Sequence, residues 1–176
     1  MQDSLSFRPL RREDLCLMQG WLANPHIAAW WGEEACNIES VAEKYEPRID
    51  GIEPTHLFMI EYGGRPIGWF QWYRWSDYPE HARKLGAELE AAGIDLAIGE
   101  ADMIGQGIGP AVIGRFIDEF IFVDASITAV VSDPEKANIR SVRAFEKAGF
   151  RVIKTVILAG ESCQRCVVRL NSPYHP

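Results

Sequence analysis

The chain has 176 residues, which fits one domain with a single core and leaves no room for two well-cored domains. With 47% hydrophobic and 24% charged residues, its composition excludes a disordered or collagen-like protein. Because Asp and Glu exceed Lys and Arg by 25 to 18, the net charge of −7 argues against a nucleic-acid partner and favours a cationic substrate, although a charge of this size also serves solubility.

Apolar residues recur along the chain with the period of two typical of strands or the spacing of three and four typical of helices. In chain order, these patterns predict a strand at 4–10, a helix at 11–25, a short helix or turn at 26–35, a helix at 40–48, a hairpin at 56–75, a loop or irregular helix at 76–91, a strand and glycine-rich loop at 93–110, a helix at 111–122, a strand at 126–134, a helix at 138–150 and a strand pair at 151–158 and 164–170. Strands and helices interleave, so the fold class is a mixed α/β or α+β domain.

Glycine and proline mark the ends of several of these elements. Pro25 closes the first helical segment, and Gly149 ends the last one. Gly63 and Gly64 separate two apolar runs, which is typical of a tight turn between antiparallel strands. The segment 76–91 lacks both periodicities, and a loop of that length is often functional.

The sequence predicts neither a membrane span nor an export signal. No apolar run reaches about 18 residues, and residues 1–10 lack the charged start and apolar stretch of a signal peptide. We therefore expect a cytoplasmic protein whose four cysteines are reduced thiols. Cys163 and Cys166 form a lone CxxC pair in a strand-like stretch, where residues three apart face opposite ways, so no metal site is expected.

The glycine-rich segment Gly105–Pro110 lies between a predicted strand and a predicted helix. Glycines let the backbone approach a ligand, and the partial positive charge of a helix N-terminus favours a phosphate there. Pro110 is expected at the first helical position, where a missing N–H costs nothing. A loop of this kind can also be a plain chain turn. It lacks the Lys and Ser or Thr of a P-loop and the early strand–helix–strand context of a dinucleotide-binding fingerprint.

A second motif follows the next predicted strand and makes the glycine loop more specific. It consists of Asn138, Ser141, Gly149 and Phe150. The two motifs together resemble the GNAT superfamily of acetyl-CoA-dependent N-acetyltransferases, whose Gln/Arg-x-x-Gly-x-Gly/Ala pattern falls on 104–109. The resemblance covers nearly the whole chain. It implies the GNAT fold as a single acetyltransferase domain over 1–176, with a mixed central β-sheet that has a splayed central strand and is flanked by helices.

Four further segments resemble the aminoglycoside 6'-N-acetyltransferases within that superfamily and occur in that group's order. They are the tryptophan-pair segment HIAAWWGEE, the strand PIGWFQWY, the strand GIDLAIGE and the Asp-Pro of SDP. Siderophore hydroxylysine acetylases share much of this pattern, so the reaction class is better defined than the substrate class. The resemblance implies acetyl-CoA as cosubstrate, no metal, and a polycationic aminoglycoside as substrate, with antibiotic resistance as the outcome.

Two residues depart from the family pattern. Ile104 stands where the pyrophosphate loop usually has Gln or Arg, which removes a polar side chain but no backbone donor, so coenzyme A binding should survive. Phe145 stands where many members have the Tyr that protonates the departing thiolate, and a phenyl ring cannot donate a proton. Water or the substrate's ammonium would then supply the proton, or the thiolate would leave unprotonated.

The resemblance implies that Asp95 is the general base. An aminoglycoside amine is mostly protonated at pH 7, so a base must remove its proton before or during attack on the thioester. From the residues alone, Asp95 could equally cap or pair at the end of a strand. The resemblance also implies that the backbone N–H of Ile98 donates a hydrogen bond to the thioester oxygen. The other expected coenzyme A contacts are Gly105, Gln106, Gly107, Ile108 and Gly109 at the pyrophosphate and Asn138 at the pantetheine arm.

A polycation with several hydroxyls requires acids and flat apolar walls around it. The candidate acids are Asp77, Glu88, Asp95 and Asp133. The candidate walls, each of which could instead belong to the core, are Trp30, Trp31, Trp72, Tyr73 and Trp75. Gln71 and Tyr73 alternate with Trp72 along one strand and should share one face of it. The predicted substrate-binding set is Trp31, Gln71, Tyr73, Asp77, Asp95 and Asp133.

Three hypotheses follow. The leading one is an aminoglycoside 6'-N-acetyltransferase that acts as a monomer or a homodimer. A second is an enzyme that acylates another small amine, such as an N-hydroxylysine siderophore precursor, which would require a carboxylate-binding Arg or Lys in the cleft. The third is a non-catalytic acetyl-CoA-binding module, which Ile104 and Phe145 favour and Asp95 disfavours.

Overall fold

The computed structural model describes residues 4–31, 37–157 and 163–171, and these contain a seven-stranded sheet with helices. The strands are β1 (Leu5–Pro9), β2 (Thr55–Tyr62), β3 (Arg65–Arg74), β4 (Ala92–Ile98), β5 (Ala129–Ser132), β6 (Arg151–Ile157) and β7 (Cys163–Leu170). The helices are α1 (Leu15–Leu22), α2 (Pro25–Trp31), α3 (Ile38–Ile49), α4 (Pro79–Leu85), α5 (Ile108–Phe116) and α6 (Ile139–Lys147). Short helical turns complete the described secondary structure, namely η2 (Arg12–Asp14), η4 (Trp75–Asp77), η5 (Ala101–Met103) and η6 (Ile117–Ile121).

The sheet is mixed, as the sequence predicts. Hydrogen-bonded neighbours follow the order β1-β2-β3-β4-β5-β7-β6. β1 pairs antiparallel with β2, and β7 pairs antiparallel with both β5 and β6. β4 and β5 form a parallel pair, with Ala92 opposite Val130 and Gly93 opposite Val131. Parallel neighbours require a crossover connection, which the glycine-rich loop and α5 provide. The predicted fold class is confirmed.

The chain divides into two compact units, each described by itself below. The first consists of residues 1–72 and 95–108, and the second of residues 73–94 and 109–176. The division falls inside β3 and inside β4, so each of these strands contributes to both units. The single acetyltransferase domain expected over 1–176 stays a prediction.

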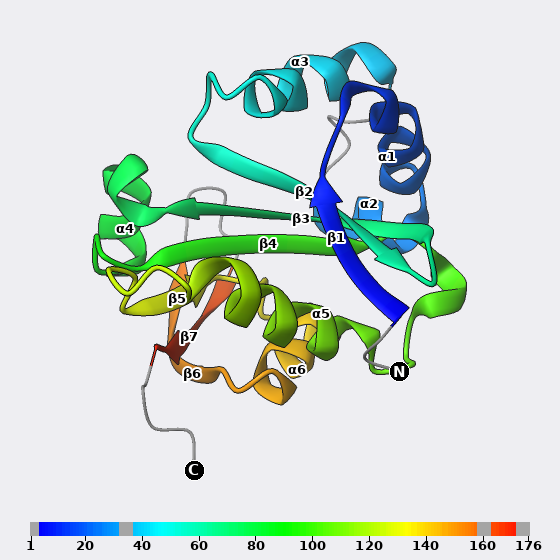
Figure 1. Cartoon of the computed structure of the whole chain (residues 1–176). Helices are drawn as coiled ribbons and strands as arrows, with labels where there is room; N and C mark the ends of the chain where they lie inside the picture. Colours follow the sequence, from blue (N-terminus) through cyan, green and yellow to red (C-terminus); the bar gives the residue numbers. More distant parts are fainter. Residues whose placement is uncertain (1–3, 32–36, 158–162, 172–176) are drawn as a thin grey trace. The chain divides into compact units, whose positions relative to one another are not determined.

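The first unit has a core between its helices and strands β2 to β4. Figure 1 shows α1 and α3 side by side above these strands. The fully buried side chains of this core include Met18, Val41, Tyr45, Met59 and Trp69. The Trp69 indole stacks on Trp21 at a centroid separation of 6.1 Å and meets the edge of Trp31 at 5.2 Å. Three of the six tryptophans therefore pack against one another in or beside this core.

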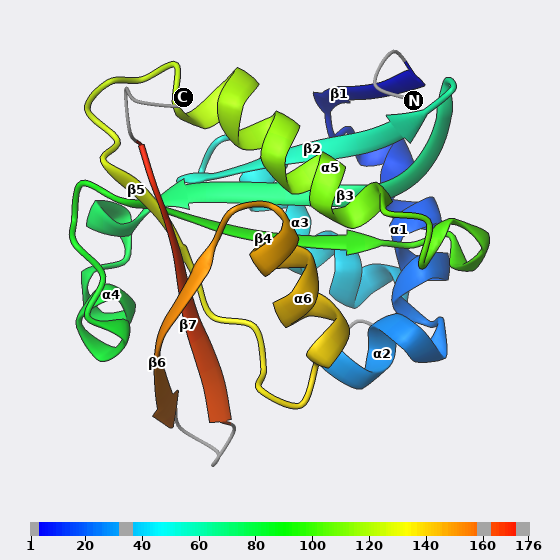
Figure 2. The ribbon, with the colours of Figure 1, turned by 90° about the horizontal axis from the view of Figure 1, so that it is seen from below.

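The second unit has its own core, to which η4, α4, β5 and β7 contribute. Figure 2 shows β6 and β7 running side by side, and their pairing is antiparallel. The buried apolar side chains of this core are Trp75, Ala82, Leu85, Ala91, Ala129 and Val131. On α5 and the π-helical turn η6, Val112, Ile113, Phe116 and Ile117 are buried. The helical spacing in the sequence predicts this buried face.

Local signals explain where several elements begin and turn. The Asn37 side chain accepts a hydrogen bond from the Ser40 amide at 2.8 Å and so caps α3. Gly63 and Gly64 have φ values of 60° and 77°, the left-handed conformation that a two-residue hairpin turn requires. The predicted hairpin is confirmed.

Three local predictions need correction. The helix after the glycine loop begins at Ile108 rather than Ala111, so Pro110 is its third residue. A first turn tolerates proline at this place too, because none of its N–H groups has an intrahelical acceptor. Pro25 opens α2 as well as closing the segment before it.

Within the described ranges, no helix is both long and apolar enough to span a bilayer.

Candidate active site

Asp95 lies near the middle of β4 in the first unit, where its side chain is half-buried. Its Oδ2 accepts a hydrogen bond of 2.8 Å from Nε2 of Gln71, on β3. Gln71 is itself buried, with 8% of its surface exposed. The structure thus brings together two of the residues that the sequence assigns to the site, and it presents a carboxylate whose position is fixed by a neutral donor.

Arg48 and Tyr45, both on α3, extend this arrangement, and the sequence analysis assigned neither of them to it. Arg48 Nη1 donates to Gln71 Oε1 at 3.1 Å, and its guanidinium carbon lies 5.5 Å from the centroid of the Tyr45 ring. Tyr45 is fully buried, and burial raises its pKa, with the nearby Asp95 charge acting in the same direction and Arg48 opposing it. Tyr45 therefore stays a neutral phenol and packs in the core of the first unit rather than acting as a second base.

The end of β4 is tied to α1, α2 and β3. The Ile98 carbonyl accepts a hydrogen bond from His26 Nε2 at 3.1 Å, so that nitrogen carries the proton. Glu100 accepts a hydrogen bond from the Trp21 indole at 2.8 Å and pairs with Arg65. The role of the Ile98 N–H toward a thioester oxygen stays a prediction, but its strand end is held in place from several sides.

The glycine loop combines two left-handed glycines with the start of a helix. Gly105 and Gly107 adopt φ values of 80° and 78°, and a Cβ added at either would meet no atom within 4 Å. A left-handed residue beside a right-handed helical one turns successive N–H groups toward one point, which is one way that proteins bind anions. The helix α5 begins at Ile108, directly after the loop, and a helix N-terminus also favours an anion. The Gln106 side chain donates to the Asp102 carbonyl at 2.6 Å and so braces the loop. Ile108 and Gly109 are the first two residues of the helix, and the contacts of this loop with the pyrophosphate of coenzyme A stay predictions.

A Gly107→Val variant is expected to raise the KM for acetyl-CoA about tenfold, because a left-handed conformation costs a branched side chain roughly 1–2 kcal/mol. Steady-state kinetics at varied acetyl-CoA concentration measure this change. Gly64→Val is the matched control: Gly64 has a φ of 77° and equally open surroundings, but it lies in the β2–β3 turn. The control should lose stability without a change in this KM, and an equal rise in both variants would contradict the assignment of the loop.

Asp133 follows β5 in the second unit, and its side chain is only 15% exposed. Its Oδ2 lies 3.5 Å from His81 Nε2, and the His81 ring stacks on Trp75 with a centroid separation of 5.3 Å. Trp75 is 1% exposed and belongs to the core of this unit, so of the two roles left open for it the structure supports core packing rather than a substrate wall.

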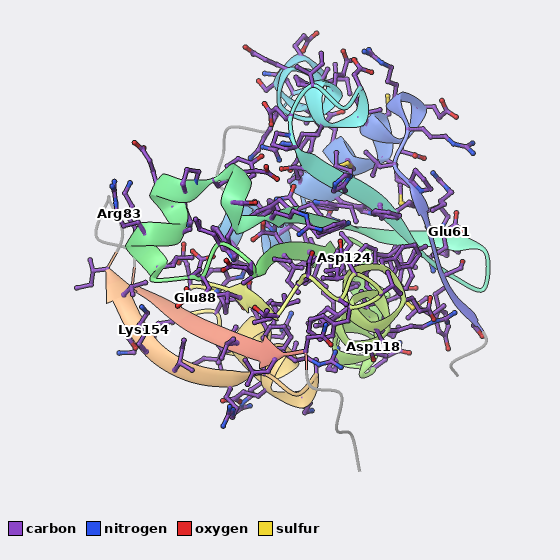
Figure 3. The ribbon with its side chains drawn as sticks, turned by 60° about the vertical axis from the view of Figure 1, so that its left-hand side comes forward. Glu61, Arg83, Glu88, Asp118, Asp124 and Lys154 are labelled. Atoms are coloured by element: carbon purple, nitrogen blue, oxygen red, sulfur yellow. The ribbon has the colours of Figure 1, made fainter. Side chains whose placement is uncertain are left out.

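The other predicted substrate contacts lie at different depths. In the second unit, Tyr73 is half-buried against Trp75 and Tyr78, each at a ring-centroid separation of 5.1 Å. Asp77 is exposed on η4. Glu88 is exposed on the connection from α4 to β4, as Figure 3 shows. Their roles toward a substrate stay predictions.

In the first unit, the aromatic candidates have neighbours of their own. Trp31 is half-buried and packs edge-on against Trp69, while Trp30 is 38% exposed. Trp72 stacks on His56 at 4.7 Å. The rest of the tryptophan-pair segment, residues 32–34, lies outside the described residues.

Asn138 and Phe145 lie in the second unit, at the N-terminal cap of α6 and within that helix. The Asn138 side-chain oxygen accepts a hydrogen bond of 3.1 Å from the Ser141 amide and so caps α6. Its role toward the pantetheine arm stays a prediction. Phe145 is 3% exposed and packs edge-on against Phe150 at 5.0 Å. Its structural role is therefore apolar packing.

Among the described residues, no group of three or more His, Cys, Asp or Glu side chains is arranged to hold a metal ion. The side chains of Cys163 and Cys166, on which the CxxC interpretation depends, lie outside the described part of the structure, as does Cys36. Cys16 is an exposed free thiol.

Comparison with known proteins places this geometry in context. Residues 11–158 match the family model described as "Acetyltransferase (GNAT) domain". The chain is 31% identical over 156 residues to aminoglycoside N(6')-acetyltransferase type 1 of Klebsiella pneumoniae, over 88% of this chain and 77% of that protein. The crystal structure of aminoglycoside acetyltransferase AAC(6')-Ib in complex with coenzyme A matches with a TM-score of 0.79 and 28% identity, over 95% of both chains. The structure of AAC(6')-Ib in complex with ribostamycin and coenzyme A matches with a TM-score of 0.80 and 30% identity, over 96% of this chain and 94% of that one.

Proposed function

The chain belongs to the GNAT acetyltransferase family, and from this premise we propose that it transfers an acetyl group from acetyl-CoA to the 6'-amine of aminoglycoside antibiotics. The resemblance found in the sequence is confirmed, and the protein is an acyltransferase that uses acetyl-CoA as cosubstrate. Acetylation converts an amine that carries a positive charge at pH 7 into a neutral amide. Resistance to the antibiotic follows if binding of the drug to its target depends on that charge.

The observation that carries the proposal is the Asp95–Gln71 pair. Gln71 Nε2 donates to Asp95 Oδ2 at 2.8 Å, so the half-buried carboxylate is held in one orientation. A carboxylate with this support can accept a proton from an ammonium group and leave the amine able to attack. The relatives described above act on aminoglycosides by name, which agrees with a substrate amine of this kind.

The chemistry divides between the cosubstrate and the chain's own residues. Acetyl-CoA supplies the acetyl group as a thioester. Asp95 accepts the proton of the substrate amine, the amine nitrogen forms a bond to the acetyl carbon, and the carbon–sulfur bond breaks. The Ile98 N–H is the proposed donor to the thioester oxygen, and the glycine loop is the proposed pyrophosphate site. Because Phe145 is buried and apolar, water or the substrate's proton accounts for protonation of the thiolate.

The remaining substrate contacts are proposed on charge. The net charge of −7 and the acids Asp77 and Asp133 favour a polycation over an anionic amino acid. An N-hydroxylysine precursor carries a carboxylate, which requires a cationic partner near the base. Arg48 is engaged by Gln71 and Glu53, so this arginine is not the partner that such a substrate would need. We also propose that the protein acts in the cytoplasm, where acetyl-CoA is made.

Release of coenzyme A, followed with a thiol-reactive dye, tests the proposal. We expect saturable release with kanamycin, tobramycin and amikacin and no release above the hydrolysis background with N-hydroxylysine. Release with N-hydroxylysine but with no aminoglycoside would overturn the proposed substrate in favour of the small-amine hypothesis. Tight acetyl-CoA binding without release for any amine would favour a non-catalytic module.

A further inference from the structure

Arg48 connects the last turn of α3 to the proposed base within the first unit. Its Nη1 donates to Gln71 Oε1 at 3.1 Å, and Gln71 Nε2 donates to Asp95 Oδ2 at 2.8 Å. Because Gln71 is buried, water competes little for either hydrogen bond. A continuous series of hydrogen bonds therefore runs from the helix through β3 to β4.

The charges at the two ends of this series determine the orientation of the amide between them. A guanidinium group has only donors, and an ionised carboxylate has only acceptors. If the oxygen and nitrogen of Gln71 exchanged places, donors would face donors at Arg48 and acceptors would face acceptors at Asp95. Both contacts would then be repulsive, so Arg48 selects the orientation in which Gln71 donates to the carboxylate.

Arg48 is itself held by two further contacts. Its Nε donates to Glu53 at 2.9 Å, and its guanidinium lies over the buried ring of Tyr45. The Arg48 side chain is only 19% exposed, so these contacts hold its guanidinium largely out of solvent.

We propose that Arg48 is a positioning residue for acetyl transfer. It holds the Gln71 amide so that one N–H donates to Asp95, and this donation keeps the carboxylate in the orientation from which it accepts the substrate proton. Arg48 touches no reacting atom and acts only through Gln71. The part of the proposal that concerns catalysis rests on the proposed function, whereas the orientation of the amide is a property of the free protein.

A double-mutant cycle tests the catalytic part. We expect Arg48→Met to lower kcat/KM for kanamycin about tenfold, with most of the loss in kcat. A loss of about tenfold is the lower end of the range found when a residue that orients a metal ligand is replaced. In a Gln71→Met background the same change should lower kcat/KM less than about twofold, because Gln71, through which Arg48 acts on Asp95, is already absent. Arg48→Lys should recover to within about threefold of wild type, since an ammonium group also has only donors.

Arg12→Met is the matched control for the loss of an arginine that anchors α3. Arg12 pairs with Glu46 and Asp50 near the end of the same helix. Its replacement should leave kcat/KM within about twofold of wild type, because exposed ion pairs contribute little. An equal loss in Arg12→Met and Arg48→Met, or a full tenfold effect of Arg48→Met in the Gln71→Met background, would overturn the proposal.

A second measurement is independent of any substrate. The side-chain N–H signals of Gln71 in a ¹⁵N NMR spectrum are identified by their loss in Gln71→Met. We expect Arg48→Met to move these signals, while Arg12→Met leaves them in place. Unchanged signals in Arg48→Met would overturn the orientation even if activity fell. If wild-type protein acetylates no aminoglycoside, the proposed function fails, and the NMR result alone still decides whether Arg48 orients Gln71.

Discussion

Replacing Asp95 with Asn is expected to lower kcat by about 10²- to 10⁴-fold, the contribution typical of a general base, while acetyl-CoA still binds. Asn has nearly the size of Asp, and its side-chain oxygen can keep the 2.8 Å hydrogen bond from Gln71 Nε2. The variant therefore loses the capacity to take a proton but little of the local structure. Steady-state kinetics give kcat, and calorimetric titration gives the Kd for acetyl-CoA.

Asp50→Asn is the control for the loss of one negative charge from the first unit. Asp50 follows α3 and bonds to Arg12 at 2.6 Å on the surface. Its replacement should leave kcat within about twofold of wild type, as is usual for exposed ion pairs. Turnover at the wild-type rate in Asp95→Asn would contradict the assignment of the base.

Gly68→Ala is expected to destabilise the protein by about 3 kcal/mol, at the upper end of the usual cost of overpacking. A Cβ on Gly68 would lie 2.1 Å from the Ala97 carbonyl oxygen and 3.0 Å from the Ile98 Cα. Both neighbours are backbone atoms of β4, so relief requires the strands to move apart. For a chain of this size, the melting temperature should fall by about 9 °C, and urea unfolding gives the free energy.

Gly114→Ala is the matched control, because it adds the same methyl group where there is room. Gly114 lies inside α5, and a Cβ there would meet nothing within 4 Å. This variant should gain about 0.5–1 kcal/mol in the free energy of unfolding, since alanine favours the helix. If Gly68→Ala were as stable as wild type, the close approach of β3 and β4 would be contradicted.

Much of the fold could be predicted from local patterns, because burial imposes a period on the apolar residues of each element. Glycines mark where elements turn or end, because left-handed backbone conformations favour glycine. The hairpin turn at Gly63 and Gly64 and the end of α6 near Gly149 were predictable for this reason. The start of α5 was misplaced because Pro110 fits several positions in a first turn. The closeness of Gly68 to Ala97 had no local signal at all, because it depends on how two strands pair.

The candidate site could be predicted only in part. Asp95 and Gln71 belong to recognisable strands, but the hydrogen bond between them depends on the register of β3 and β4. Arg48 lies 23 residues before Gln71, and no sequence spacing encodes a contact between a helix end and a strand. The flat apolar ring of a tryptophan suits either a substrate wall or a core, and the Trp75 ring packs in the core of the second unit.

The most direct test of the proposed function compares two aminoglycosides that are identical except at the 6' position, where one has an amine and the other a hydroxyl. The proposal predicts rapid release of coenzyme A with the 6'-amine and a product whose mass rises by one acetyl group, which two-dimensional NMR places on the 6' nitrogen. It predicts no acetylated product from the 6'-hydroxyl compound. Equal acetylation of both compounds would contradict the assignment of the 6'-amine as the acceptor.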